Sequence, residues 1–358
     1  MPEFHGDKPL RVCIMNDNFY RSSGAAIAIR RISRELTGVE YFIAGCRNDG
    51  LPEDLSWIPA HRYERFDLKT SNPARLANEL VRFKRWFKRQ KLDLVHCHHR
   101  RISALINAWG IPVLYTGQLT FPHAIWFRLL HPKRMTAITP SVAQNLRETT
   151  GGEVLACIGN PTEFPKTPPF IDLEKVKNSA VCVGRLEAVK GHKHLLAAWK
   201  LLLDRGHRYR LDIVGEGPLR GELEEQSRHD GTSNLIRFCG FNQNVSEFLG
   251  NSLFAILVSR VEGQGIVTLE AAAMGRATLL TAVHGSVDLI PPGAKLTNGL
   301  AYGNVKELAE AVQSWFAHPD DVVREGEQFF HFLKHSSDPK MVACAYRDIY
   351  RTIVSGAA

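Results

Sequence analysis

Short apolar runs alternate with helix-length amphipathic stretches along almost the whole chain, and this alternation restricts the fold more than any other feature. Runs that are apolar on both faces are typical of parallel strands with helices packed on either side of the sheet. Between them, apolar positions recur with helical spacing, for example over residues 192–204 and 305–316. The pattern therefore predicts an α/β protein built from doubly wound parallel sheets. The predicted strands are residues 10–16, 41–45, 92–97, 112–116, 135–139, 153–158, 179–184, 210–215, 234–240, 254–259 and 277–282.

The length of the chain and one irregular stretch predict two such sheets. With 358 residues the chain is longer than most domains that fold around a single hydrophobic core. Residues 159–170 contain four prolines and no periodicity, which is typical of a linker. We expect a first domain at residues 1–160, a linker at 161–170, a second domain at 171–335, and a last helix within 336–358 that returns to the first domain. The carboxyl ends of the strands in the two sheets are expected to face each other across a cleft. Ligands of such sheets bind beyond these ends, so residues that directly follow a strand are the candidates for the site.

Composition narrows the class of protein further. An apolar fraction of 44% and a charged fraction of 23% are ordinary for a soluble globular protein, and no apolar run approaches the roughly 20 residues of a membrane span. The seven cysteines include no CxxC pair and lie partly in strand-like runs, so we expect reduced thiols and a cytoplasmic protein. A net charge of +8 favours anionic partners such as phosphorylated ligands, nucleic acid or an anionic membrane face.

The strongest functional pattern follows the predicted strand at residues 254–259. Gly263 and Gly265 predict a tight turn that leads into a helix, and the free amides of a helix N-terminus suit a diphosphate. Glu262 in the turn can accept hydrogen bonds from sugar hydroxyls, and Glu270 inside the helix can accept them from a ribose diol. The alternative is that these glutamates are solvated side chains at the end of a helix.

Two cations lie in the loop after the predicted strand at residues 179–184. Arg185 and Lys190 can offset the charge of a diphosphate leaving group without a metal. The alternative for each residue alone is a cation on a surface loop.

A glycine-rich turn at residues 213–221 follows another predicted strand. Its Gly215 and Gly217 resemble the start of a dinucleotide fingerprint, which alone is a weak signal. Since the next strand does not end in an acid that would hold an adenosine ribose, close approach of a nucleotide to this turn is preferred over a nicotinamide site. Gly240 and Phe241, after that next strand, would line a base pocket.

Taken in order, these motifs resemble the donor domain of the retaining glycosyltransferases of family 4, also called glycosyltransferase group 1. The likeness is dense over residues 179–300 and looser, but in register, in the first half. It implies the GT-B fold, a nucleotide-diphosphate-sugar donor, transfer with retention, and neither a metal nor another cofactor. The residues that carry it are Gly184, Arg185, Leu186, Lys190 and Gly191; Gly215, Gly217 and Pro218; Phe238 and Gly240; and Glu262, Gly263, Gly265 and Glu270.

The resemblance also implies a role for each donor-site residue. Arg185 and Lys190 would contact the donor diphosphate, Glu262 the transferred sugar, and Glu270 the nucleotide ribose. The amides of Gly265, Ile266 and Val267 would support the sugar and phosphates, and His284, Gly285 and Ser286 resemble a further turn of the family that faces the cleft.

The first half offers candidates near the phosphates and the acceptor. Ser22, Ser23 and Gly24 open a helix that resembles the family's glycine-containing loop near the donor phosphates, and the alternative is a plain N-cap. In the sequence HCHH, adjacent histidines cannot all face one metal ion, so we expect His96 or His98 to line the acceptor side, as family members do.

One position departs from the family. The family commonly reads T-x-H after the strand at residues 112–116, whereas this chain has Gln118, which cannot act as a base. His123 can substitute only if the loop folds back. Retaining transfer does not strictly need a protein base, because the departing phosphate oxygen can take the acceptor proton.

Basic and aromatic residues are interleaved in two stretches, from Val81 to Lys91 and from Phe121 to Arg134. Membrane-associated members of the family carry such patches against anionic lipid, which predicts a peripheral position on the inner face of the cytoplasmic membrane. The alternative is a solvated helix face with its aromatic residues in the core. A nucleic-acid-binding protein is disfavoured, because no helix-turn-helix, zinc-finger or RNP signature is present.

The sequence thus predicts a transferase that moves a sugar from a nucleotide diphosphate to a hydroxyl of a glycan or glycolipid, in cell-surface polysaccharide or lipopolysaccharide assembly. The alternative on the same fold is a nucleotide-sugar sensor or scaffold without catalytic activity.

Overall fold

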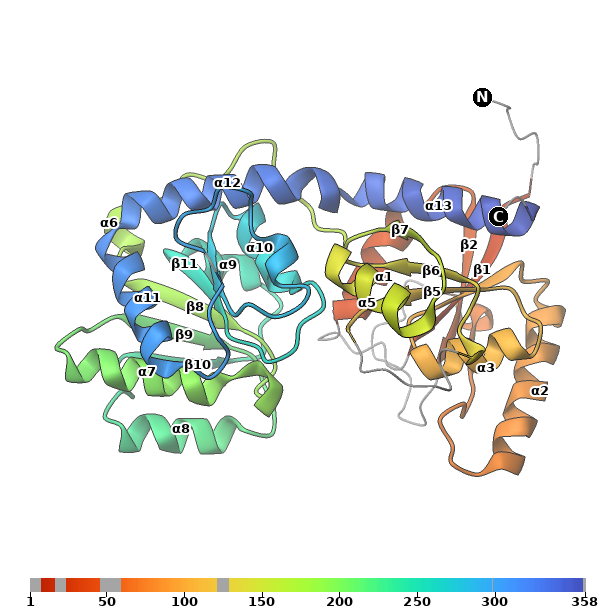
Figure 1. Cartoon of the computed structure of the whole chain (residues 1–358), viewed down its shortest axis with the longest axis horizontal. Coiled ribbons are helices and arrows are strands. Elements are labelled where there is room, and N and C mark those ends of the chain that lie inside the picture. The colour runs from red at the N-terminus through yellow and green to blue at the C-terminus, as the bar shows by residue number, and fades with distance from the viewer. Residues whose placement is uncertain (1–7, 17–23, 46–58, 121–128, 298, 357–358) are drawn as a thin grey trace. The chain divides into compact units, whose positions relative to one another are not determined.

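The computed structural model describes residues 8–16, 24–45, 59–120, 129–297 and 299–356 (Figure 1). Contacts within the chain divide it into two compact units. Unit 1 combines Met1–Pro161 with Pro339–Ala358, and unit 2 is Thr162–Asp338. Each unit has its own parallel β-sheet with helices on its faces, which confirms the predicted fold class of two doubly wound parallel sheets.

The described part of unit 1 holds a seven-stranded parallel sheet in the order β3-β2-β1-β4-β5-β6-β7. The chain starts at β1, proceeds to one edge, and then returns to place β4 beside β1, so the winding direction reverses between these two strands. The strands are β1 (Leu10–Asn16), β2 (Val39–Gly45), β3 (Tyr63–Arg65), β4 (Leu94–Cys97), β5 (Val113–Gly117), β6 (Arg134–Ala137) and β7 (Val154–Cys157). The helices are α1 (Gly24–Glu35), η1 (Ala60–Arg62), α2 (Pro73–Arg89), α3 (Arg100–Ala108), α5 (Pro140–Thr150) and α13 (Pro339–Ser355).

Successive side chains of a strand point to opposite faces of the sheet, so in unit 1 one strand contributes to two separate cores. In β1, Val12 and Ile14 join the cluster formed with α1 and α13, whereas Cys13 and Met15 join the cluster formed with α2 and α3. All four side chains are buried, as expected for a strand covered on both faces.

Helix α5 shows how local sequence sets the limits of an element. Thr139 caps its N-terminus by accepting a hydrogen bond from the amide of Val142, and Pro140 occupies the first turn. At the other end, Gly151 adopts a φ of 71°, the left-handed conformation that ends many helices. The sequence between these residues therefore fits one helix of this length.

In unit 2, the described residues form a five-stranded parallel sheet in the order β10-β9-β8-β11-β12. Successive strands run outward from β8 to β10, and the chain then returns to place β11 on the other side of β8. The strands are β8 (Ser179–Val183), β9 (Arg210–Val214), β10 (Ile236–Gly240), β11 (Phe254–Leu257) and β12 (Thr278–Leu280). The helices are α6 (Leu173–Val176), η2 (Ala188–Lys190), α7 (His192–Asp204), α8 (Arg220–His229), α9 (Val245–Gly250), α10 (Ile266–Ala273), η3 (Val287–Leu289), α11 (Val305–Ala317) and α12 (Pro319–Ser337).

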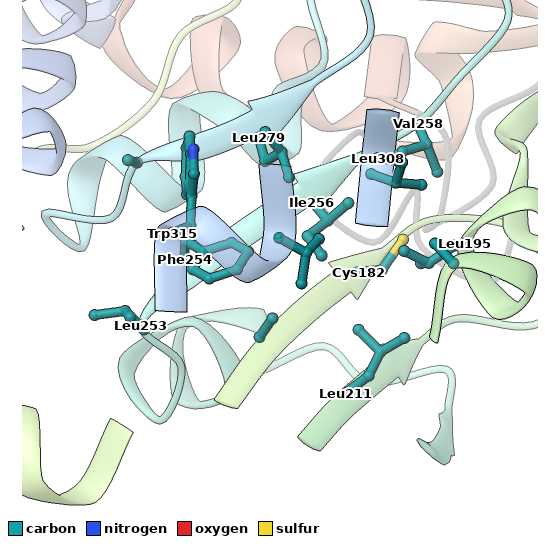
Figure 2. Close-up of a cluster of buried hydrophobic side chains, with 14 of the residues drawn as sticks. Cys182, Leu195, Leu211, Leu253, Phe254, Ile256, Val258, Leu279, Leu308 and Trp315 are labelled. Atoms are coloured by element: carbon teal, nitrogen blue, oxygen red, sulfur yellow. The ribbon is translucent and has the colours of Figure 1, made fainter. Parts of the chain in front are cut away.

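A large apolar cluster joins the sheet of unit 2 to α7 and α11 (Figure 2). Phe254 of β11 and Trp315 of α11 lie side by side, with ring centroids 4.9 Å apart in an edge-to-face arrangement. Cys182 of β8 and Leu195 of α7 extend the cluster. This packing fixes the strands whose carboxyl ends carry the candidate site.

A buried carboxylate attaches α12 to the loop before α11. The carboxylate of Glu325 accepts hydrogen bonds from the backbone amides of Lys295, Leu296 and Thr297, at 3.0, 2.8 and 2.6 Å. We expect Glu325→Gln to lower the free energy of unfolding by about 2 kcal/mol, because its amide nitrogen cannot accept from these buried donors. Urea denaturation would measure the change. Glu327→Gln is the matched control, since Glu327 is exposed on the same helix, and an equal loss there would contradict this account.

Candidate functional site

Backbone hydrogen bonds join the loops that follow the strands of unit 2 at their carboxyl ends. The amide of Gly215, after β9, donates to the carbonyl of Gly240 at 2.8 Å. The amide of Leu186, after β8, donates to the carbonyl of Glu216 at 2.9 Å. The amide of Arg260, after β11, donates to the carbonyl of Val189 at 2.8 Å. The predicted donor-site motifs after these strands therefore lie at one edge of one sheet.

The glycines of the turn after β9 are required by the close approach of two backbones. Gly215 has a φ of 149°, and a β-carbon built on it would lie 1.9 Å from the carbonyl oxygen of Gly184. A β-carbon on Gly217 would lie 2.5 Å from the carbonyl oxygen of Leu186. Only glycine allows the loops after β8 and β9 to pack this closely.

Lys190 and Glu262 form an ion pair that joins two loops of the site. Nζ of Lys190 lies 2.7 Å from Oε2 of Glu262, and the side chains are only 22% and 12% exposed. The two residues come from the loops after β8 and β11, the adjacent strands between which the winding direction of this sheet reverses. In open α/β sheets this switch point is where ligands bind. The pair thus lies where ligands bind in sheets of this kind.

Arg185 and Phe241 lie at the same edge with more exposed side chains. Nη1 of Arg185 lies 2.7 Å from Oε1 of Glu187, and its side chain is 58% exposed. Phe241 directly follows the end of β10 and is 48% exposed, which is unusual for a large apolar side chain. An exposed cation and an exposed ring are available to a phosphorylated aromatic ligand.

Helix α10 begins at this edge, immediately after the turn that carries Glu262. Gly265 is its N-cap residue, with a φ of 55°, and has no side chain that could cap the amides of Ile266 and Val267. These are among the first amides of the helix, which have no carbonyl partner within it, so they suit an anion. Glu270 lies one turn further along and is half-buried.

The turn at residues 284–286 packs on the backbone of the Glu262 loop. A β-carbon on Gly285, which has a φ of 86°, would lie 1.7 Å from the carbonyl oxygen of Gly263. This contact joins the turn at residues 284–286 to the loop that carries Glu262.

His192 follows Lys190 and Gly191 and is buried at the start of α7. Burial, with a smaller contribution from the charge of Lys190, lowers the pKa of His192 from 6.5 to about 4. The folded protein therefore holds this imidazole in its neutral form at neutral pH.

We expect unit 2 to lose stability as the pH falls from 6.5 to 4, because the unfolded chain then binds a proton that folded His192 does not. The difference in pKa corresponds to about 3 kcal/mol at pH 4. Thermal unfolding at successive pH values would show a smaller acid-induced loss for His192→Leu than for the wild type. Parallel pH profiles for the two proteins would contradict the assignment.

The candidates from the first half of the chain lie in unit 1, and its described part places Gly24, His96, His98 and Gln118. Gly24 begins α1. His96 is buried, with Nδ1 2.7 Å from the hydroxyl of Tyr350 and Nε2 2.7 Å from Oγ1 of Thr116. Because both nitrogens of His96 have partners within unit 1, a role at the acceptor is better suited to His98. His123, Ser22 and Ser23 lie outside the described residues.

Gln118 and His98 form a pair at the carboxyl ends of β5 and β4. The amide nitrogen of Gln118 lies 3.0 Å from Nδ1 of His98. Burial lowers the pKa of His98 from 6.5 to about 4, so the ring is neutral at pH 7.

In the basic stretch from Val81 to Lys91, the aromatic residues pack inside the protein. Phe83 and Trp86 of α2 are buried, whereas Val81 and the charged residues Arg82, Arg85, Lys88 and Arg89 are exposed. Leu129 and Leu130 are exposed at the end of the second stretch, of which residues 121–128 lie outside the described part. A membrane contact of α2 would therefore rest mainly on its charges, because its large aromatic residues Phe83 and Trp86 are buried.

The described residues contain neither a metal-binding cluster nor a membrane-spanning helix. No cluster of three or more His, Cys, Asp or Glu side chains there could hold a metal ion. None of the described helices is both long enough and apolar enough to cross a bilayer.

Comparison with known proteins assigns the second unit to a family. The model of the family described as "Glycosyl transferases group 1" matches residues 177–318. Unit 2 belongs to the group 1 glycosyltransferases. The match covers all the strands of the unit 2 sheet, together with Lys190 and Glu262.

Relatives of known sequence resemble this group 1 unit over part of their length. The putative glycosyltransferase EpsF of Bacillus subtilis is 30% identical over 133 residues, which are 37% of this chain and 33% of that protein. The lipopolysaccharide core biosynthesis glycosyltransferase LpsD of Rhizobium meliloti is 30% identical over 155 residues, or 42% of this chain and 44% of that protein. The chain thus matches less than half the length of these relatives.

A solved structure resembles the fold over nearly the whole chain. The Anabaena protein Alr3699/HepE, solved in complex with UDP, has a TM-score of 0.79 at 15% sequence identity, covering 96% of this chain and all of that one. The chain therefore has the predicted GT-B fold.

Proposed function

We propose that the protein is a retaining glycosyltransferase that moves a sugar from a nucleoside diphosphate to a hydroxyl of a glycan or glycolipid. The contact of Lys190 with Glu262 carries this proposal, since it places a cation and a carboxylate together at the switch point of the unit 2 sheet. A cation there suits a diphosphate, and a carboxylate beside it suits the hydroxyls of the attached sugar.

Each residue of the site has a role in this reaction. Lys190 and Arg185 stabilise the negative charge that develops on the leaving diphosphate, together with the amides of Ile266 and Val267. Glu262 accepts hydrogen bonds from the transferred sugar and orients its anomeric carbon. Phe241 stacks on the base, and Glu270 accepts hydrogen bonds from the ribose.

The proton of the acceptor hydroxyl goes to the leaving group. The bond between the anomeric carbon and the diphosphate oxygen breaks, and the bond to the acceptor oxygen forms on the same face of the sugar. The departing phosphate oxygen takes the acceptor proton, so atoms and charge balance without a protein base. Gln118, which cannot act as a base, is compatible with this route.

Two relatives support a choice of substrate class. HepE was solved with UDP, and LpsD is named for lipopolysaccharide core biosynthesis. We therefore propose a UDP-sugar as donor and a cell-surface glycan or glycolipid as acceptor. The reaction would use no metal or other cofactor, because Lys190 and Arg185 supply the positive charge. The acceptor would be met at the inner face of the cytoplasmic membrane.

Release of the free nucleoside diphosphate tests the proposal. The purified protein is incubated with UDP-, GDP- or ADP-glucose and a glycolipid extract, with and without EDTA. We expect release of UDP, with EDTA having no effect. Binding of UDP-glucose without any release would instead favour a sensor or scaffold, and no binding of any of the three would contradict the donor site itself.

A further inference from the structure

A layer of buried polar side chains lies directly below the carboxyl edge of the sheet in unit 1. His96, Thr116 and Thr136 each stand one residue before the end of β4, β5 and β6, and all three are buried. Nε2 of His96 lies 2.7 Å from Oγ1 of Thr116, which lies 2.6 Å from Oγ1 of Thr136. Polar groups are costly inside a core, and a network that satisfies them fixes the arrangement of the strands that carry them.

The C-terminal helix α13 completes this layer. The hydroxyl of Tyr350 lies 2.7 Å from Nδ1 of His96, although the two residues are 254 positions apart in the chain. The ring of Tyr346, one turn earlier, packs against the ring of His96 with 5.0 Å between centroids. Both tyrosines are buried. The orientation of His96 is therefore set from both sides, by β5 and by α13.

The pair of His98 and Gln118 lies next to this layer. The ring of His98 packs against the ring of His96, with 4.4 Å between centroids. Its backbone amide donates to the carbonyl of Met15 at 3.0 Å, which places His98 between β4 and β1, where the winding of the sheet reverses. This is the switch point of unit 1, the counterpart of the position of Lys190 and Glu262 in unit 2.

The contact with Gln118 determines the tautomer of His98. An amide nitrogen can only donate, so Nδ1 of His98 accepts and the proton of the neutral ring lies on Nε2. Within the described residues, Nε2 is a buried atom that has no hydrogen-bond partner. A buried donor without a partner is costly, so an acceptor atom from outside the described residues is expected at this position.

We propose that Tyr350 is a positioning residue for the acceptor side: acting through His96, it holds the ring of His98 in the orientation in which Gln118 fixes its tautomer, with the Nε2 proton available to a sugar hydroxyl oxygen. Only the identity of that ligand rests on the proposed function. The loss of the Tyr350 hydroxyl would leave Nδ1 of His96 without a partner, and the ring that supports His98 would then turn or change its own tautomer.

Side-chain nitrogen NMR of the full chain labelled with ¹⁵N-histidine tests the proposal, with His98→Gln used to assign the signals of His98. In the wild type we expect one protonated and one unprotonated nitrogen. In Tyr350→Phe we expect both signals to move toward intermediate values, as two tautomers exchange. Tyr115→Phe is the matched control, because Tyr115 is equally buried and precedes Thr116 on the opposite face of β5. An unchanged His98 in Tyr350→Phe, or the same change in Tyr115→Phe, would overturn the proposal.

Two further measurements separate this proposal from a general loss of structure and from the proposed function. Gln118→Met removes the hydrogen-bond donor to Nδ1 of His98. We expect both nitrogen signals of His98 to move toward intermediate values, as in Tyr350→Phe. The dissociation constant for UDP should stay within about twofold of the wild type in Tyr350→Phe, since the proposed donor site lies in unit 2. A UDP affinity weakened about tenfold would contradict a role confined to the acceptor side. If the wild type binds no UDP, the proposed function fails, while the NMR result still decides the role of Tyr350.

Discussion

Lys190→Ala is expected to lower kcat/KM for transfer by about 100-fold or more, the usual effect of losing a preorganised electrostatic contact in an active site. The substitution removes the cation proposed to stabilise the leaving diphosphate. It also leaves Glu262, which is only 12% exposed, without the Nζ group that lies 2.7 Å from its carboxylate. Weaker binding of the donor diphosphate raises KM and weaker stabilisation of the transition state lowers kcat, so kcat/KM should fall more than kcat. Initial rates of UDP release at several donor concentrations would measure the two constants.

Lys193→Ala provides the matched control for this prediction. Lys193 lies three positions further along the chain and forms an ion pair with Glu222, but both of these side chains are about half exposed. Exposed ion pairs contribute little, so kcat/KM should stay within about twofold of the wild type. Equal losses for Lys190→Ala and Lys193→Ala would show that positive charge in general, rather than the position of Lys190, supports activity.

Gly215→Ala is expected to destabilise unit 2 by about 3 kcal/mol or more and to abolish UDP binding. The φ of 149° is available almost only to glycine, and the added β-carbon would lie 1.9 Å from the carbonyl oxygen of Gly184. The loops after β8 and β9 would have to separate, which would move Arg185 and Lys190 away from the turn. Urea denaturation gives the change in stability, and UDP titration gives the change in binding.

Gly206→Ala separates backbone strain from this steric conflict. Gly206 also has a positive φ, of 86°, but a β-carbon built there would have no atom within 4 Å. We expect it to cost only about 1 kcal/mol, the penalty for a left-handed non-glycine residue, and to leave UDP binding intact. A Gly215→Ala protein as stable as Gly206→Ala would contradict the close packing of the two loops.

The sequence pattern predicted most of the fold because buried parallel strands leave a strong signal. The predicted strand at residues 10–16 coincides with β1, and the predicted helix at residues 192–204 coincides with α7. The strand β3 (Tyr63–Arg65) escaped prediction, because three half-buried residues have neither an apolar run nor a clear alternation. Strand order could not be predicted either, since it depends on pairings between distant segments.

The sequence predicted site residues where a motif spans one loop, and missed those that depend on the fold. Glycines and charges after strands pointed to Lys190 and Glu262, but the 2.7 Å contact between residues 72 positions apart required the structure. Tyr346 and Tyr350 lie in the predicted last helix, but no motif pointed to either residue. The contact of the Tyr350 hydroxyl with His96 depends on how α13 packs on unit 1, which no local pattern encodes.

Calorimetric titration of the wild type, Lys190→Ala and Lys193→Ala with UDP tests the central claim most directly. The claim is that the loops after β8 and β11 of unit 2 hold the diphosphate of a nucleotide sugar. We predict that UDP binds the wild type and Lys193→Ala with similar affinity, and binds Lys190→Ala at least about tenfold more weakly. Equal affinity of all three proteins for UDP, or no binding to the wild type, would contradict the claim.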